Sequence, residues 1–204
     1  MAPDDNYTKY IGELKGVIDQ FPLAALKRVA DILFHAYEND HAIFLFGNGG
    51  SAALASHLAT DLAKGTHFPG PPSMKNVRRM RVLALTDNTP LMTAWSNDLS
   101  YEEVFSGQLE NFVRSRDVAF AISGSGNSPS VLRALELARR SGATTVGFAG
   151  FGGGKMNELL DCAVVLESQN MQQVEDAHVI LSHLLFLDLK ARIEAKAESI
   201  AAKS

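Results

Sequence analysis

Residues 43–61 constrain the fold of this chain more than any other stretch. The apolar run 43–46 predicts a buried strand, and the glycines that follow on either side of Asn48 allow a sharp turn. Ser51 then stands at a helix N-cap position, before an alanine- and leucine-rich segment that predicts a helix. Because this order brings unpaired backbone N–H groups and the helix dipole to one point, the stretch predicts a site for an anion such as phosphate.

A second loop of the same kind follows the apolar run 118–122. Three hydroxyl side chains, Ser123, Ser125 and Ser128, fall within six residues, directly before a helix predicted at 129–141. The glycines between them keep the backbone close to any ligand. Three hydroxyls at a helix N-terminus suit the three oxygens of a phosphate monoester, so we prefer a phosphate site to a purely structural loop.

Apolar runs alternate with helical segments along the whole chain. The predicted strands lie at 43–46, 82–86, 118–122, 144–148 and 162–166, with a short helix at 155–160. This alternation predicts an α/β fold, a doubly wound five-stranded parallel sheet flanked by helices. We expect a single domain over 1–204, with N-terminal helices at about 7–39, an α/β core at about 41–167 and a long C-terminal helix at about 171–198. Both glycine loops fall at the carboxyl ends of strands, where such sheets bind ligands.

The composition narrows the class of protein. The chain has 204 residues, a hydrophobic fraction of 46% and a net charge of −4, which give no sign of a nucleic-acid or membrane partner. Its one cysteine, Cys162, excludes an internal disulfide and a cysteine-based metal cluster. The first residues are acidic where a signal peptide would be basic, so we expect a cytoplasmic protein.

Two nucleotide-binding motifs fit the chain poorly. Gly47, Gly49 and Ala52 match the dinucleotide fingerprint, but that fingerprint expects an acidic residue about 20 positions on, and the second predicted strand ends near Asp87, too far along. A nucleotide P-loop fails at Lys155, because no serine or threonine follows it. A smaller phosphorylated ligand is the better expectation.

Polar residues on two predicted helices form a second candidate site. His57 and Asp61 share one face of the first helix at i and i+4. The polar residues that open the C-terminal helix are Gln172, Gln173, Glu175, Asp176, His178 and His183. Glu175 and His183 are about 80° apart around that helix, so they can converge. Two histidines and two carboxylates suit a divalent metal such as zinc, or acid–base chemistry, although buried hydrogen bonding explains the same residues equally well.

Together these motifs resemble a sugar isomerase (SIS) domain of the phosphoheptose isomerase type, over about residues 7–195. The most specific pieces are residues 47–51 with His57 six positions on, Ser96-Asn97-Asp98, residues 122–128 and Gly153-Gly154-Lys155. The resemblance implies an aldose–ketose isomerase that converts sedoheptulose 7-phosphate to glycero-manno-heptose 7-phosphate through an enediol. It also implies a homotetramer with zinc-containing active sites at the subunit contacts.

The resemblance assigns the site residues as well. It implies that the metal is held by His57, Asp61, Glu175 and His183, with Asp61 as the base and His183 as the acid. The residues expected to contact the substrate are Asn48, Gly49, Gly50, Ser51, Asn97, Asp98, Ser123, Ser125, Asn127, Ser128 and Glu175.

The chain departs from the family pattern at two of these positions. Asp61 stands where glutamate is usual, and Glu175 where glutamine is usual. These departures leave the metal requirement, the metal's identity and the exact sugar open. The alternatives are an isomerase for another phosphosugar, or a non-catalytic SIS module that binds a sugar phosphate or recruits a protein partner.

Overall fold

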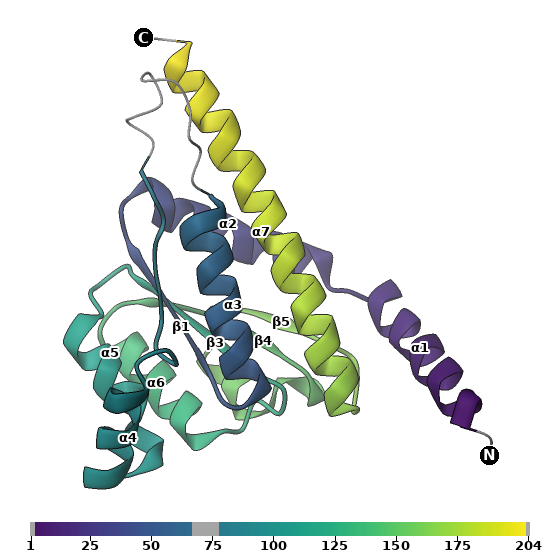
Figure 1. Ribbon diagram of the computed structural model, residues 1–204. Helices are drawn as coiled ribbons and strands as arrows, with labels where there is room; N and C mark the ends of the chain where they lie inside the picture. Colours follow the sequence, from purple (N-terminus) through teal and green to yellow (C-terminus); the bar gives the residue numbers. More distant parts are fainter. Residues whose placement is uncertain (1–2, 67–77, 203–204) are drawn as a thin grey trace.

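The computed structural model describes residues 3–66 and 78–202, which form one parallel sheet with helices on both faces (Figure 1). The strands are β1 (Ala42–Gly47), β2 (Arg81–Ala84), β3 (Val118–Ser123), β4 (Thr144–Ala149) and β5 (Cys162–Val165). The α-helices are α1 (Pro3–Asp19), α2 (Leu23–Glu38), α3 (Gly50–Gly65), α4 (Thr89–Asp98), α5 (Ser106–Phe112), α6 (Pro129–Arg140) and α7 (Met171–Ala201). Two 3-10 helices are η2 (Tyr101–Glu103) and η3 (Phe151–Leu159).

The predicted α/β fold is confirmed. The five strands pair in the order β2-β1-β3-β4-β5, all parallel, and they lie at the predicted places to within one or two residues. The C-terminal helix α7 is long, as predicted. The short helix expected at 155–160 is the second part of the 3-10 helix η3, which begins after a kink where Gly152, Gly153 and Gly154 adopt positive φ angles.

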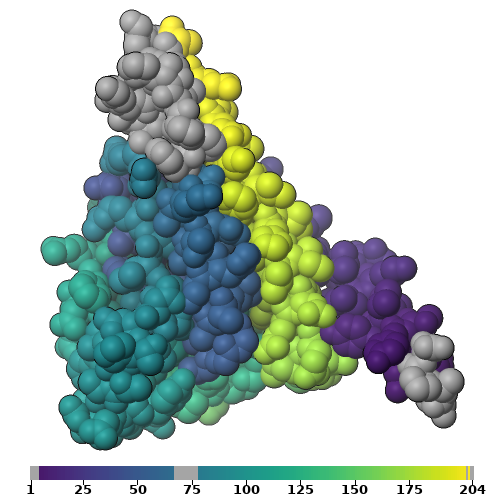
Figure 2. All heavy atoms as spheres, in the orientation of Figure 1, coloured from purple at the N-terminus to yellow at the C-terminus, as the bar shows by residue number. Residues whose placement is uncertain are grey.

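Two hydrophobic clusters fix the layers. Helices α2, α3 and α7 bury their apolar faces against one side of the sheet, around Phe120 and Phe148. Helices α5 and α6 cover the other side, around Phe46 and Phe105. Figures 1 and 2 both show α7 lying beside α3, while α1 extends away from the body of the molecule. Within the described ranges, no helix is long and apolar enough to cross a membrane.

The strand order places the two glycine loops side by side. After β1 the chain crosses to β2 at one edge, and after β2 it returns to β3 on the other side of β1. This reversal is the topological switch point, where doubly wound sheets leave a crevice for ligands. Gly47 pairs with Ile122 there, and a side chain at Gly47 would stand only 2.5 Å from the Ile122 carbonyl oxygen. Glycine at this position therefore allows the two loops to approach closely.

Candidate active site

A cavity of about 270 Å³ lies at the switch point, between the two glycine loops and the start of α7. It is lined by residues 48–51 and 122–125, with Ser128, Met171 and Glu175. The N-termini of α3, α6 and α7 all begin in this region, so their unpaired N–H groups and positive dipole ends favour an anion. The cavity lining contains three of the predicted hydroxyls of the second loop, and Ser51 adds a fourth.

Hydrogen bonds inside the second loop set its shape. The Ser123 hydroxyl accepts from the backbone N–H of Gly126 at 3.1 Å, and Ser125 accepts from that of Asn127 at 3.3 Å. The Asn127 side chain donates to the Ser125 carbonyl oxygen and accepts from the backbone N–H of Lys155. Asn127 is absent from the described cavity lining, so in this structure its amide ties the loop to η3.

Asn48 of the first loop is held at both ends of its amide. Its Oδ1 accepts from the Tyr101 hydroxyl at 2.8 Å, and its Nδ2 donates to the Ser130 hydroxyl at 2.9 Å. Its backbone carbonyl accepts from the N–H groups of Ser51 and Ala52, at the start of α3. Tyr101 could not be predicted as part of the site, because a contact between residues 53 positions apart leaves no periodic pattern in the sequence.

His57 and Asp61 of α3 come together with His183 of α7 where these two helices pack against each other. One ligand atom from each lies within 4.8 Å of the others, with His57 Nε2 at 2.8 Å from His183 Nε2 and 3.4 Å from Asp61 Oδ2. Two imidazole nitrogens and a carboxylate oxygen in this arrangement can hold a divalent metal ion. Three protein ligands with a fourth position open are the donor set of catalytic zinc sites. The donor set therefore fits the metal that the family resemblance implies.

Glu175 lies outside that cluster in the part of the chain that the structure describes. Its carboxylate packs on Gly50, where an added side chain would meet Oε1 at 2.9 Å, and it lines the cavity. The structure thus groups three of the four predicted metal ligands and places the fourth among the predicted substrate contacts. Asn97 and Asp98 hydrogen-bond to each other at the end of α4 and do not line the cavity of their own chain.

Two of the remaining polar residues in the first turns of α7, Gln173 and Asp176, bond to side chains of α1, and a third, His178, is buried. Tyr10 donates to Asp176 at 2.6 Å, and this carboxylate raises the pKa of Tyr10 to about 12. Gln173 donates to Glu13 at 2.8 Å. His178 is 1% exposed and packs on Phe148, on the face of α7 that covers the sheet. His178 therefore lies in the core and does not join His57, Asp61 and His183, although the sequence places it among the polar residues that open α7.

Known proteins match both the sequence and the fold. The SIS domain family model matches residues 6–150. A phosphoheptose isomerase from Paramagnetospirillum magneticum is 43% identical over 143 residues, 70% of this chain and 71% of that protein. One from Akkermansia muciniphila is 36% identical over 184 residues, 87% of this chain and 94% of that protein.

Among solved structures, the phosphoheptose isomerase GmhA from Neisseria gonorrhoeae superposes with a TM-score of 0.83 at 25% identity, covering 92% of this chain and 98% of that one. The sequence matches extend over most of both proteins, and the matched fold is the same parallel sheet with flanking helices. This chain therefore belongs to the SIS domain proteins and, within them, to the phosphoheptose isomerase family.

Proposed function

We propose that this protein is an aldose–ketose isomerase that interconverts sedoheptulose 7-phosphate and glycero-manno-heptose 7-phosphate. Its relatives carry the name phosphoheptose isomerase, and one observation in the structure carries the proposal further. The phosphate-type cavity and the His57–Asp61–His183 cluster lie along the same pair of helices, α3 and α7. A substrate with a phosphate at one end and its reacting carbons at the other fits this layout.

The spacing along the helices favours a long sugar. Gly50 contacts Glu175 beside the cavity, and His57 contacts His183 seven and eight positions further along the two helices. At 1.5 Å per residue this is about 10–12 Å of helix. When the phosphate is bound in the cavity, an open seven-carbon chain reaches further towards His57 and His183 than a five-carbon chain, by two carbon–carbon bonds.

The residues divide the chemistry between them. Backbone N–H groups and the hydroxyls of the two loops bind the phosphate, and Glu175 accepts hydrogen bonds from the sugar hydroxyls. Asp61 removes a proton from the carbon next to the carbonyl and returns it to the neighbouring carbon, while His183 moves a proton between the two oxygens. Atoms balance, because the reaction only relocates hydrogen. Where Asp61 instead joins His57 and His183 in holding a zinc ion, it would be a ligand and not the free base, and the ion would supply a Lewis acid that polarises the carbonyl.

We also propose that the active form is a cytoplasmic homotetramer with sites at subunit contacts, each subunit forming one SIS domain. Asn97 and Asp98 lie outside the cavity of their own chain, so as substrate contacts they would have to serve another copy. Helix α1 also exposes Tyr7 and Ile11, which are 70% and 53% accessible. Exposed apolar residues on a helix that extends from the body of the molecule (Figure 1) suit a protein–protein contact.

The test is turnover of sedoheptulose 7-phosphate by the purified protein, with added zinc and with a chelator, beside five- and six-carbon ketose phosphates. We expect product from the seven-carbon sugar, and loss of product on chelation. Asp61→Asn should abolish turnover, and its metal content separates a ligand role from a base role. Binding of sugar phosphates without any turnover would contradict the proposed isomerase activity and favour a sensing module. Turnover of a shorter sugar alone would contradict sedoheptulose 7-phosphate as the substrate.

A further inference from the structure

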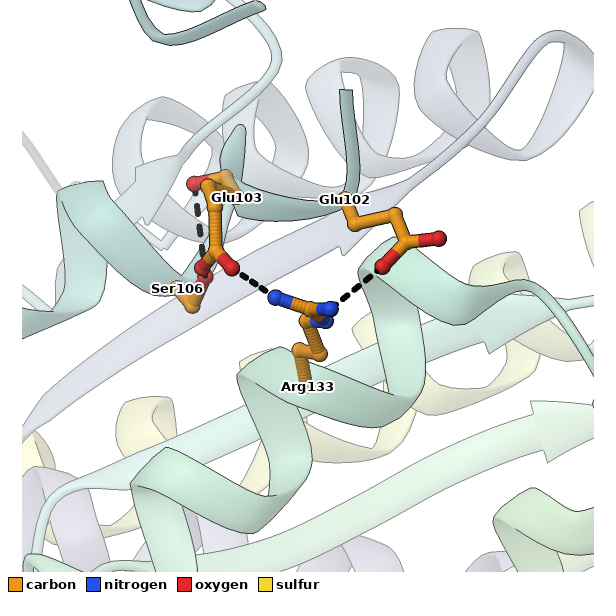
Figure 3. A network of polar contacts seen from close by, with 4 residues as sticks. All are labelled: Glu102, Glu103, Ser106 and Arg133. Atoms are coloured by element: carbon orange, nitrogen blue, oxygen red, sulfur yellow. Dashed lines mark hydrogen bonds and ion pairs between the residues drawn. The ribbon is translucent and has the colours of Figure 1, made fainter. Parts of the chain in front are cut away.

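A ring of polar contacts connects α6 to the rim of the cavity. Arg133 of α6 pairs with both acidic residues of η2, through Nη2 to Glu102 Oε2 at 2.6 Å and through Nη1 to Glu103 Oε1 (Figure 3). The Ser106 hydroxyl donates to the other Glu103 oxygen at 2.6 Å. These contacts lie outside the cavity, yet they fix the short helix that carries Tyr101.

The ring closes through Asn48. Tyr101, the first residue of η2, donates to Asn48 Oδ1, and Asn48 Nδ2 donates to Ser130 of α6. Ser130 lies one turn before Arg133 on the same helix, so both ends of the ring return to α6. Ser130 is 2% exposed, which makes it a firm anchor for the amide.

Holding the amide at both ends decides what it offers to a ligand. A carboxamide has two N–H donors and one oxygen. With Oδ1 accepting from Tyr101 and one N–H bonded to Ser130, one N–H donor and one lone pair of Oδ1 are left for a ligand, and the two bonds fix where each of them points. Without Tyr101 the amide can turn over and present its oxygen, which would repel a phosphate oxygen and match only a sugar hydroxyl.

The pairing in the ring is between charged groups. The Ser106 hydroxyl and the Arg133 guanidinium, in that order of effect, hold the pKa of Glu103 below its usual value, so the carboxylate is ionised at neutral pH. A planar guanidinium that bridges two carboxylates is a rigid connection, which a lysine reproduces only as a point charge.

We propose that Arg133 is a positioning residue that acts on the ligand cavity through η2 and Tyr101, by fixing the orientation of the Asn48 amide. It touches neither the cavity nor the His57–Asp61–His183 cluster. The inference rests on the proposed function for the choice of ligand, sedoheptulose 7-phosphate.

The test is a double-mutant cycle on the full-length protein. Arg133→Met and Tyr101→Phe should each raise the Kd for sedoheptulose 7-phosphate about tenfold, the effect of one lost hydrogen bond to an oriented group. The double variant should be no weaker than the weaker single variant, because both act through Asn48. KM should rise with kcat little changed, since Asp61 and His183 are untouched, and Arg133→Lys should recover part of the affinity.

Arg192 provides the matched control. Its guanidinium also bridges two carboxylates, Asp31 at 2.6 Å and Asp188 at 2.8 Å, but it lies far along α7 from the cavity. Arg192→Met should change thermal stability as much as Arg133→Met and leave the Kd unchanged. Independent, multiplying effects of the Arg133 and Tyr101 variants would overturn the inference, as would an Arg133→Met protein that loses stability but keeps its affinity.

Crystal structures of the wild type and of Arg133→Met test the role of Arg133 without relying on the proposed substrate. We expect the Tyr101–Asn48 hydrogen bond to be lost in the variant, and its persistence would overturn the inference. A wild-type protein that binds no sedoheptulose 7-phosphate would contradict the proposed function alone, and the two crystal structures would then decide the inference.

Discussion

Helix α7 carries two histidines, five residues apart, whose surroundings are opposite. His183 is exposed and faces α3, where its Nε2 lies 2.8 Å from His57 Nε2. His178 is 1% exposed against Phe148, and neither of its ring nitrogens has a hydrogen-bond partner of good geometry among the described residues. Burial lowers the pKa of His178 to about 4, although the nearby Ala149 carbonyl opposes this slightly.

The two histidines show how one helix serves two purposes. Five residues correspond to about 140° around the helix axis, so His178 points into the core while His183 is exposed beside α3. Burial keeps the imidazole of His178 neutral by lowering its pKa, and the imidazole of His183 stands beside a carboxylate and a second imidazole. Whether a histidine of α7 belongs to the core or to the candidate active site therefore depends on the residues that it contacts, and not on its being a histidine.

The same substitution at both positions should separate activity from stability. His183→Leu should lower turnover about 10²–10⁴-fold, the usual value of a general acid or base, and change the free energy of unfolding by less than about 0.5 kcal/mol. His178→Leu should keep turnover within a few-fold and leave the protein as stable or more so at pH 7, because it removes unpaired buried polar atoms. Turnover assays and urea unfolding of both variants measure this, and loss of activity in both would erase the distinction.

Acid should destabilise the protein through the buried histidine. The pKa of His178 is about 4 in the folded chain and near 6.5 when exposed, so between these values the unfolded state binds a proton that the folded state does not. The free energy of unfolding should therefore be independent of this group above pH 6.5 and fall as the pH drops towards 4, by about 3 kcal/mol in all. His178→Leu should flatten this part of the stability curve, while His35→Gln, which removes an exposed histidine, should not. An equal slope in wild type and His178→Leu would contradict the assignment.

The smallest effect is expected at a third side of α7, where α1 contacts it. Tyr10→Phe removes the hydroxyl that donates to Asp176 and should lower the free energy of unfolding by about 1 kcal/mol or less, because the bond is at the surface. Thermal unfolding checks this, with Tyr7→Phe, an exposed tyrosine on the same helix, as the control. A loss of turnover larger than the loss of stability would show that α1 belongs to the active site.

The sheet and the cavity between the two glycine loops could be predicted from the sequence because their signals are local. The apolar runs at 43–46 and 118–122 appear as β1 and β3, and the polar loop after each strand follows directly from its residues. Parallel strand order then brings loops at the carboxyl ends together without further information. The expected anion site therefore depended on nothing beyond strand and loop identification.

The details of the second site depend on packing between helices, which the sequence does not encode locally. The helical angle between Glu175 and His183 allows them to share a face, but the neighbour that each one meets depends on how α3 lies against α7. Glu175 lies beside Gly50, and His183 beside His57. Asn97 and Asp98 were expected near the ligand from their motif alone, and their place at the end of α4 is set by tertiary structure.

The fixed alignment of α3 and α7 also limits how this enzyme type can change during evolution. Gly50 meets Glu175, His57 meets His183 and Gly65 meets Phe186, so the two helices run in the same direction. Inserting or deleting one residue in either helix would rotate everything beyond it by about 100° and separate the histidines. New sugar specificities on this scaffold should therefore arise by exchanging exposed side chains of α3 and α7, while the number of residues between the glycine loop and the histidines stays constant.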